Sequence, residues 1–308
     1  MALLRSAFIA LSRNRALRRF AERSRAGTRL SSRFVAGLEV EDALRVAEAV
    51  NRQGMHVTLD SLGESVTSAE EAHRAAEIYH RLLDLIAQRK LDSTISVKLT
   101  QMGLTLDPAL AGEIAEGLAA HAAATGNFLR IDMEDSSLTQ ATVDMVRRLH
   151  ARPALRGHIG IVIQAYLYRS QADVEQLIAE GIRIRLCKGA YKEPASAAFP
   201  QKSDVDANYI RLSQSLLHSS IYHGLATHDE AMVNAAIAFT AEHKIPKDHF
   251  EFQMLFGVRR DLQRRLVAQG YPVRIYIPFG REWYPYFMRR LAERPANVLF
   301  LAKNLLRS

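Results

Sequence analysis

Two patterns of apolar residues alternate along the chain from about residue 36. Short apolar runs rich in β-branched residues predict strands, and longer stretches with an apolar residue every three or four positions predict amphipathic helices. The predicted strands are residues 55–63, 94–100, 128–134, 158–167, 183–190, 224–229, 250–255 and 273–280. The predicted helices are residues 67–90, 107–126, 138–152, 170–181, 204–220, 229–244, 259–270 and 283–295.

Strands that alternate with helices are typical of parallel βαβ units. Eight units predict an α/β fold of the (β/α)8 TIM-barrel type, with an open doubly wound sheet as the alternative. Local signals support two of the helices. Asp107 and Pro108 are a suitable N-cap and first helical residue, and Gly126 is a suitable stop. Thr67 with Glu70 three residues later indicates a capping box.

Positive charge is concentrated in residues 1–33, which contain nine arginines and one acidic residue. The net charge of this segment is therefore +8, which equals the net charge of the whole chain. Apolar residues recur among these arginines at roughly helical spacing, so we predict a basic amphipathic helical arm over residues 1–35 and a barrel domain over 36–308. Such an arm is compatible with packing on the barrel, with contact to an anionic membrane surface or with an organelle transit peptide. The barrel domain lacks the basic face expected of a nucleic-acid-binding domain.

The composition excludes several kinds of site. Cys187 is the one cysteine, so no internal disulfide forms, which fits a reducing compartment such as the cytoplasm. No apolar run reaches the roughly 20 residues of a membrane span. Neither a dinucleotide-binding glycine motif nor a P-loop is present, and the adjacent residues 228–230 are a poor metal site, so we expect no metal. An organic cofactor held by barrel loops is the better explanation.

Polar residues gather where the predicted strands end, which is where barrel enzymes form their active sites. They are Asp60, Ser61, Lys98, Asp132, Glu134, Gln164, Tyr166, Arg185, Lys188, Gly189, Tyr191, Thr227, His228, Glu251, Gln253 and Tyr276. The segment RIRLCKGAY (183–191) brings three cations into one strand, which calls for anionic or polar partners. In the last helix, Arg289 and Arg290 suit a carboxylate or phosphate, although Arg289 is also spaced to pair with Glu293.

Eight motifs together resemble one family. They are VTLDSLGE (57–64), SVKLTQMG (96–103), RIDMED (130–135), QAYLYRS (164–170), RLCKGAYKE (185–193), ATHD (226–229), EFQMLFGVR (251–259) and RIYIPFGREWYPYFMRRLAERPAN (274–297). Over residues 34 to about 300 the chain resembles the proline dehydrogenase family, in particular short bacterial enzymes that carry only this activity. The resemblance implies FAD-dependent oxidation of L-proline to 1-pyrroline-5-carboxylate, the first step of proline degradation to glutamate, by hydride transfer from the proline ring to flavin N5.

The resemblance also implies site residues, with the final helix lying over the active-site end. The catalytic residues would be Asp132 and Arg185, with Arg185 beside flavin N5. The cofactor-binding residues would be Met133, Gln164, Arg185, Cys187, Lys188, Gly189, Ala190, Thr227 and His228. The substrate-binding residues would be Lys98, Tyr191, Leu255, Tyr276, Arg289, Arg290 and Glu293. We expect Asp132 to orient Lys98 or a tyrosine, Arg183 to form an internal ion pair, and Cys187 to act as a small apolar residue.

The implied partners are a membrane quinone that reoxidises the flavin and a separate pyrroline-5-carboxylate dehydrogenase that receives the product. A cytoplasmic protein with a peripheral contact to the inner face of the plasma membrane through residues 1–33 would be able to reach the membrane quinone. Two other functions stay open at this point. A metal-free aldolase would use Lys98 or Lys188 as a Schiff base, which the neighbouring acids oppose. A nucleic-acid or membrane adaptor would act through the arm and leave the polar strand ends without a purpose.

Overall fold

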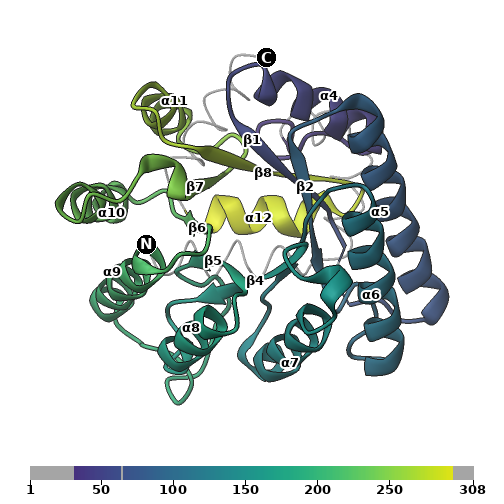
Figure 1. Cartoon of the computed structure of the whole chain (residues 1–308). Coiled ribbons are helices and arrows are strands. Elements are labelled where there is room, and N and C mark those ends of the chain that lie inside the picture. Colours follow the sequence, from purple (N-terminus) through teal and green to yellow (C-terminus); the bar gives the residue numbers. More distant parts are fainter. Residues whose placement is uncertain (1–30, 64, 294–308) are drawn as a thin grey trace.

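Eight parallel strands close into a barrel in sequence order, β1 to β8 (Figure 1). The computed structural model describes residues 31–63 and 65–293, and for residues 289–293 the backbone alone. The strands are β1 (His56–Ser61), β2 (Ser93–Lys98), β3 (Leu129–Asp132), β4 (Ile159–Gln164), β5 (Arg183–Cys187), β6 (His223–Ala226), β7 (Phe250–Leu255) and β8 (Val273–Phe279). Strand β1 pairs with β8 from His56↔Arg274 to Ser61↔Phe279, which confirms the barrel and rules out the open sheet.

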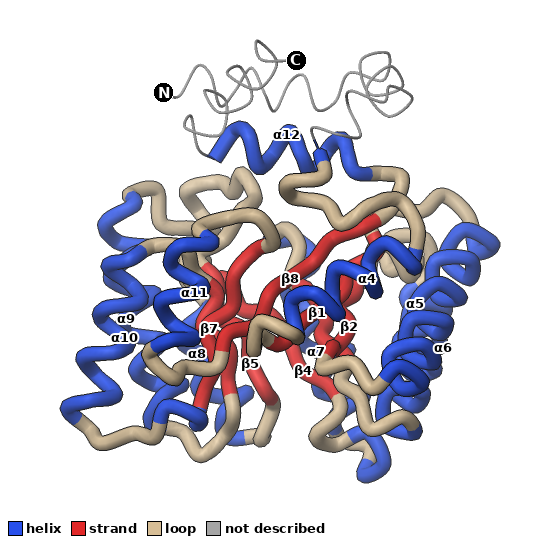
Figure 2. The backbone as a smooth tube through the Cα atoms, turned by 90° about the horizontal axis from the view of Figure 1, so that it is seen from above, coloured by secondary structure: helices blue, strands red, loops and turns tan. Residues whose placement is uncertain are grey.

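Helices surround the barrel, and one more helix crosses one of its ends (Figure 2). They are α4 (Val40–Asn51), α5 (Ala69–Arg89), α6 (Pro108–Ala124), α7 (Thr139–His150), α8 (Ser170–Ala179), α9 (Lys202–His218), α10 (Glu230–Glu242), α11 (Arg260–Ala268) and the crossing helix α12 (Trp283–Glu293). Three short 3-10 helices are η1 (Ser136–Leu138), η2 (Pro153–Leu155) and η3 (Lys247–His249). We call the end where the strands finish the upper end of the barrel, and the other the lower end.

Helix α4 was not predicted from the sequence. Its first turn is acidic, and the backbone N–H of Glu39 donates to the Asp42 carboxylate at 3.2 Å, which caps the helix. The buried residues Leu44 and Ala47 pack its apolar face on β1 and β8. The helix precedes the first predicted strand, so the alternation of strands and helices gave no place for it, and it was missed although its apolar residues are regularly spaced.

The helix caps were predicted with mixed success. The Asp107 carboxylate accepts the N–H of Ala109 at 2.8 Å and caps α6 as expected. The prediction of Thr67 as the N-cap of α5 is wrong, because Ser68 is the cap and accepts the N–H of Glu71 at 3.3 Å. Both Thr67 and Ser68 have a glutamate three residues later, so the capping pattern fits two adjacent registers equally well.

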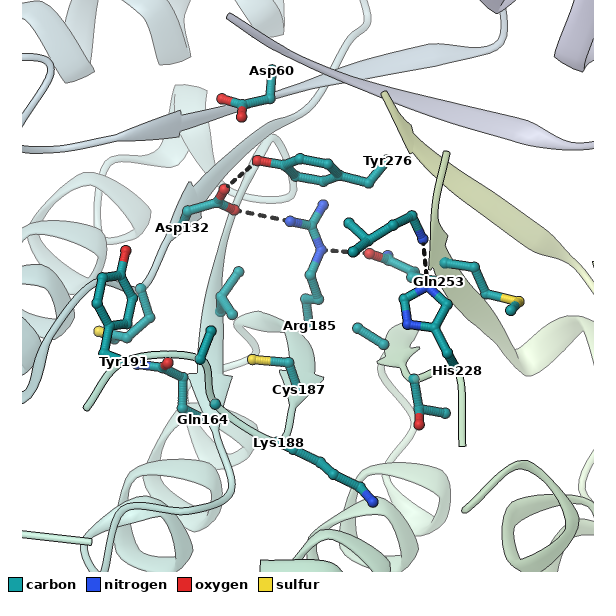
Figure 3. Close-up of a pocket in the computed structure, with 18 of the residues that line it drawn as sticks. Asp60, Asp132, Gln164, Arg185, Cys187, Lys188, Tyr191, His228, Gln253 and Tyr276 are labelled. Carbon is teal, nitrogen blue, oxygen red and sulfur yellow. Dashed lines mark hydrogen bonds and ion pairs between the residues drawn. The ribbon is translucent and has the colours of Figure 1, made fainter. Parts of the chain in front are cut away.

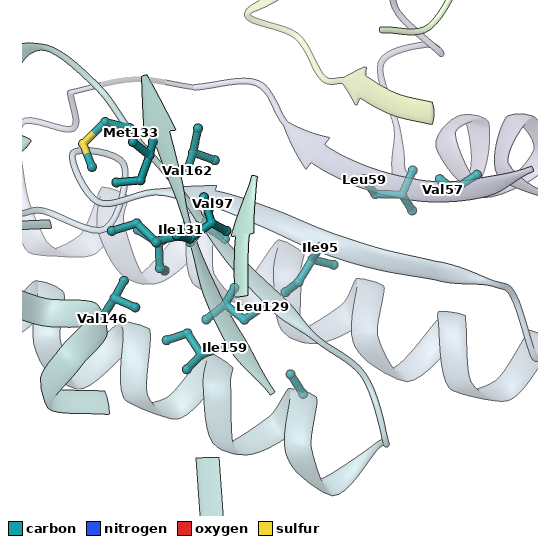
Figure 4. Packing of buried hydrophobic residues seen from close by; sticks show 14 of the residues in the cluster. Val57, Leu59, Ile95, Val97, Leu129, Ile131, Met133, Val146, Ile159 and Val162 are labelled. Atoms are coloured by element: carbon teal, nitrogen blue, oxygen red, sulfur yellow. The ribbon is translucent and has the colours of Figure 1, made fainter. Parts of the chain in front are cut away.

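The main core lies between the strands and the surrounding helices. Because successive strand residues point to opposite faces, Ile95, Val97 and Ile131 point outward and are fully buried against helices (Figure 4). The intervening residues point into the barrel, and Ser96 and Arg130 among them are polar and buried. The barrel interior is therefore a polar column, and the upper end of this column becomes the candidate site.

A second apolar cluster fixes α12 over the upper end. Trp283 is 1% exposed, and Phe287 packs against Phe34 with ring centroids 6.2 Å apart. Residues 1–30 of the predicted basic arm lie outside the described residues, so the division into arm and barrel domain stays a prediction. Within the part of the chain that the structure describes, no helix combines the length and apolar character needed to cross a bilayer.

Candidate active site

A cavity of about 460 Å³ opens at the upper end of the barrel, and each of the eight strands contributes to its lining. It is within the size range of small-molecule and cofactor sites. Every predicted site residue whose side chain the structure describes lines this cavity. These residues are Lys98, Asp132, Met133, Gln164, Arg185, Cys187, Lys188, Gly189, Ala190, Tyr191, Thr227, His228, Leu255 and Tyr276. Arg289, Arg290 and Glu293 belong to α12, but their side chains are outside the description.

Eight further residues line the cavity but were not assigned to the site from the sequence. They are Asp60, Leu62, Val162, Ala226, Asp229, Gln253, Met254 and Tyr286. The sequence indicated Asp60 and Gln253 as candidates, because both are polar residues at the predicted end of a strand. Nothing in the sequence indicated that the apolar residues among the eight belong to the site, since an apolar residue in a buried strand is expected in any barrel.

Asp132 on β3 is the centre of the polar contacts (Figure 3). Its Oδ1 accepts from Nη1 of Arg185 at 2.9 Å and from the Ser96 hydroxyl at 2.5 Å. Its Oδ2 accepts from the Tyr276 hydroxyl at 2.8 Å and lies 3.7 Å from Nζ of Lys98. Burial opposes ionisation, but the charges of Arg185 and Lys98 outweigh it, so the pKa of Asp132 is lowered. Asp132 is thus a carboxylate whose oxygens both accept hydrogen bonds, which suits an orienting role better than that of a base.

A second carboxylate, Asp60 on β1, lies on the other side of Lys98. Nζ of Lys98 is 3.3 Å from Oδ2 of Asp60, and the Tyr79 hydroxyl donates to Oδ1 at 3.2 Å. Burial raises the pKa of Asp60 in spite of the lysine. Two carboxylates beside one amine favour the charged ammonium, whereas a Schiff-base enzyme needs the neutral amine. Lys98 is therefore suited to hold an anion in place.

Lys188 follows β5 and points away from Arg185 (Figure 3). Its Nζ donates to Oδ1 of Asp206 at 2.5 Å and to Oδ2 of Asp229 at 2.7 Å. These contacts also disfavour a Schiff-base role for Lys188. The positive charge of Lys188 still lies beside the cavity, where it can attract an anionic group.

Arg183 differs from the sequence-based expectation. Its guanidinium lies over the rings of Phe128 and Tyr222, 4.9 Å from each centroid, and its Nε donates to the Tyr222 carbonyl at 3.2 Å. The expected ion pair is absent among the described side chains, because no carboxylate in residues 31–63 or 65–288 lies within ion-pair distance of Arg183. The residue lines a separate polar cavity at the lower end and does not reach the upper one.

Cys187 is a lining residue without a reactive environment. Burial raises the pKa of its thiol to about 12. Since the thiolate is the reactive form, this side chain behaves as a small apolar group next to Gln164. The sequence-based expectation for Cys187 agrees with this environment.

The loop that follows β5 is docked over the cavity by two contacts. Gly189 has φ +119°, and a Cβ at this position would overlap the ring of Tyr166. The Glu193 carboxylate accepts from the backbone N–H of Ser136 at 2.8 Å and from the Tyr166 hydroxyl at 3.3 Å. These contacts hold Tyr191, between Gly189 and Glu193, at the edge of the cavity.

The lining residues offer both apolar and positively charged surface to a ligand. Met133, Val162 and Leu255 offer apolar surface for a planar ring, and Arg185 and Lys188 bring positive charge for anionic groups. His228 is held by the Leu255 N–H, which donates to its Nε2 at 2.8 Å. Across the described residues, no three histidine, cysteine or acidic side chains converge in a way that could hold a metal ion. The apolar surface beside fixed positive charge fits an organic, negatively charged cofactor.

Comparisons with known proteins give one family. The sequence profile of the proline dehydrogenase family matches residues 43–303. The chain is 40% identical over 306 residues to Proline dehydrogenase 1 of Bacillus subtilis strain 168, covering 99% of this chain and 100% of that protein. It is 40% identical over 281 residues to the Proline dehydrogenase of Deinococcus radiodurans, covering 90% of each.

Solved structures with the same fold come from a larger protein, proline utilization A. The structure from Bdellovibrio bacteriovorus, inactivated by N-propargylglycine, has a TM-score of 0.81 and 26% identity over 86% of this chain. A Bradyrhizobium japonicum structure has a TM-score of 0.73 and 25% identity over 87% of this chain. The chain spans 32% and 31% of the length of those two proteins, so it corresponds to about one third of each.

Proposed function

Because this chain belongs to the proline dehydrogenase family, we propose that the upper cavity binds FAD and L-proline and is the place where proline is oxidised to 1-pyrroline-5-carboxylate. The chain is an oxidoreductase of this family, with proline dehydrogenase activity. The observation that supports the position of the site is the contact of Asp132 with Arg185, Lys98 and Tyr276. These side chains come from four different strands and meet at one cavity.

The cofactor would be held mainly by the loops after β4, β5 and β6. Gln164, Thr227 and His228 would contact it, together with Met133 and the segment 187–190. When bound, FAD supplies the acceptor for the hydride. Arg185 would lie at its reactive edge, where a fixed positive charge stabilises added electron density. The guanidinium of Arg185 is already held by Asp132, so little reorganisation is needed when this charge is required.

Proline would bind through its carboxylate. Lys98 lies between Asp60 and Asp132 and keeps its ammonium at a fixed place on the cavity wall. Arg289 and Arg290 would complete the grip on the carboxylate, and Tyr191, Leu255, Tyr276 and Glu293 would enclose the ring. The contribution of these residues is positioning, because an anchored carboxylate fixes which ring carbon faces the acceptor. Asp132 would orient Arg185, Lys98 and Tyr276 around the ring.

The electrons would leave through a membrane quinone, and the product would pass to a separate pyrroline-5-carboxylate dehydrogenase. The basic segment 1–33 would bring the protein to the anionic inner face of the plasma membrane from the cytoplasm. Flotation with anionic vesicles tests this part. We expect the full chain to float with the vesicles and a variant without residues 1–33 to stay behind, whereas equal flotation would contradict the membrane contact.

The function itself is tested by the colour of the purified protein. Expressed with ample riboflavin, it should be yellow, release FAD on denaturation and bleach when L-proline is added without oxygen. Lys98→Met is the control for substrate binding, because it should keep the colour but require far more proline to bleach. A folded protein that stays colourless with added FAD, or a yellow protein that proline does not bleach, would contradict the proposal. Trapping of an aldehyde by borohydride on Lys98 or Lys188 would favour an aldolase.

A further inference from the structure

A row of hydrogen-bonded side chains continues from Arg185 down into the barrel. Gln253 and Glu251 are two residues apart on β7, so both point into the interior. Nε of Arg185 donates to Oε1 of Gln253 (Figure 3), and Nε2 of Gln253 donates to Oε1 of Glu251 at 2.5 Å. Gln253 is 4% exposed and Glu251 is 3% exposed. The arginine at the cavity is thus connected to a buried carboxylate through one amide.

Glu251 is anchored at the lower end of this row. Its Oε1 accepts from Nε of Arg274 at 2.7 Å, and its Oε2 accepts from the Tyr222 hydroxyl at 3.1 Å. Burial opposes ionisation, but Arg274 outweighs it, so the pKa of Glu251 is lowered. A carboxylate only accepts hydrogen bonds, and a guanidinium only donates them. The amide of Gln253 therefore has one orientation that satisfies both neighbours, with its nitrogen toward Glu251 and its oxygen toward Arg185.

The neighbouring strand leaves room for this amide. Gly224 lies on β6, and a Cβ built at this position would overlap the side-chain amide of Gln253. Its backbone φ is outside the left-handed region, so backbone conformation does not call for glycine here. A glycine inside a strand weakens the strand, and it is expected where another group approaches closely. The missing side chain at position 224 is explained by the space that the Gln253 amide occupies.

We propose that Gln253 is a positioning residue for proline oxidation, which holds the guanidinium of Arg185 in one plane while Glu251 holds Gln253. Nε of Arg185 is bound by Gln253 and its Nη1 by Asp132, and two contacts on different edges fix a planar group. The Tyr276 ring supports the face of the same guanidinium, with its centroid 5.2 Å from Cζ. The effect of this arrangement on a flavin rests on the function proposed above.

A glutamine also suits the electrostatics of this position. Arg185 already has one carboxylate partner, Asp132, and a second carboxylate in direct contact would weaken its positive field at the cavity. The neutral amide gives Arg185 a hydrogen-bond acceptor and keeps its charge available. We therefore expect a direction of effect for each change: loss of the acceptor releases Arg185, and a carboxylate in its place holds Arg185 but reduces its field.

The decisive variant is Gln253→Met, which has a similar shape and no acceptor for Arg185. Three measurements are made on the holoenzyme: hydrogen exchange at the Arg185 side-chain Nε–H by NMR, the flavin midpoint potential, and steady-state proline oxidation for kcat and KM. We expect Arg185 exchange at least about tenfold faster and kcat about tenfold lower, with the KM for proline within about twofold. The preference of the flavin for its reduced state should fall about tenfold, which is about 30 mV for two electrons.

Tyr222→Phe is the matched control, because it removes one hydrogen bond from Glu251 on the side away from Gln253. It should leave Arg185 exchange, kcat and the midpoint potential unchanged. A Gln253→Met holoenzyme with unchanged Arg185 exchange and potential would overturn the proposal. The proposal would also be overturned if Tyr222→Phe changed Arg185 exchange and the midpoint potential as much as Gln253→Met does.

Gln253→Glu keeps the test decisive if the methionine variant does not fold. It retains an acceptor for Arg185, and its carboxyl would share one proton with the adjacent carboxyl of Glu251, which brings negative charge closer to Arg185. The Nε–H should therefore stay protected while the midpoint potential falls. Fast Arg185 exchange in this variant would contradict the positioning role. The exchange measurement is independent of flavin chemistry. A wild-type protein that binds no FAD would therefore overturn the proposed function, while the contact between Gln253 and Arg185 would still be tested.

Discussion

The upper and lower ends of the barrel interior contain the same kinds of charged side chain with different surroundings. At the lower end, Arg274 pairs with Glu251 and donates to the Val57 carbonyl at 2.7 Å, and Nη1 of Arg130 donates to two backbone carbonyls. At the upper end, Arg185 pairs with Asp132, and both side chains line the cavity. Cations at the lower end serve the fold, whereas those at the upper end are available to a ligand.

Two residues of one strand show this difference most directly. Arg183 and Arg185 both point into the barrel from β5. The guanidinium of Arg183 is covered by the rings of Phe128 and Tyr222, while that of Arg185 is held from two sides at the edge of the cavity. A charged residue in a barrel strand is therefore not in itself evidence of a catalytic role, and its neighbours decide which role it has.

The largest expected effect on stability is at the lower end. Arg274→Met leaves the buried Glu251 without its ionic partner, which should lower the free energy of unfolding by about 3–5 kcal/mol. Urea denaturation gives this value directly. The kcat of the folded variant should fall much less than that of Arg185→Met. Unchanged stability would mean that the lower end is not held together by this pair.

The largest expected effect on catalysis is at the upper end. Arg185→Met removes the fixed charge beside the proposed flavin site, so kcat should fall by about 10²–10³-fold while FAD is retained. Arg183→Met is the control from the same strand and should keep kcat within about twofold. Steady-state proline oxidation with a flavin count per protein measures both. Equal losses in the two variants would remove the distinction between the ends.

Acid should reveal the charged pair of the lower end. The pKa of Glu251 is lowered in the folded state, because Arg274 outweighs the opposing effect of burial. The pair therefore stabilises the protein above the unfolded pKa of about 4.3, and this contribution is lost as the pH falls through the folded pKa. The melting temperature of the wild type should fall more steeply between pH 6 and pH 3 than that of Glu251→Gln. Parallel curves would contradict this assignment.

A smaller contrast comes from two tyrosines that each donate to a buried carboxylate. Tyr276→Phe removes a donor from Asp132 at the upper end and should lower kcat/KM about tenfold through looser placement of proline. Tyr222→Phe removes a donor from Glu251 at the lower end and should cost about 1 kcal/mol of stability with unchanged kinetics. If Tyr222→Phe lowered kcat/KM and Tyr276→Phe lowered only the stability, the assignment of the upper end as the functional end would be wrong.

Most of the fold could be predicted because strand patterns here are strong. Each β-branched run formed a strand, and polar residues at strand ends such as Lys98 and Arg185 met at one cavity because parallel strands finish together. Helix α4 was missed because it precedes the first strand and so lies outside the regular alternation of strands and helices. The adjacent candidates Thr67 and Ser68 made the cap of α5 ambiguous by one residue.

The partners of charged residues could not be predicted, since strand periodicity shows the direction of a side chain but not its neighbours across the barrel. Sequence alone therefore gave no distinction between Arg183, which stacks on two rings, and Arg185, which pairs with Asp132. For the same reason Gln253 was seen as a polar residue at a strand end without its contact to Arg185. Such pairings depend on the register of β5 against β3 and β7, which only the closed barrel defines.

A crystal structure of the purified yellow protein with an unreactive cyclic analogue of proline tests the central claim most directly. It should show the flavin ring beside Arg185 at the upper end, with the carboxylate of the analogue against Lys98, and no ligand in the polar cavity beside Arg183. A flavin located at the lower end, or an analogue that binds away from Lys98 and Arg185, would contradict the assignment of the upper end as the catalytic one.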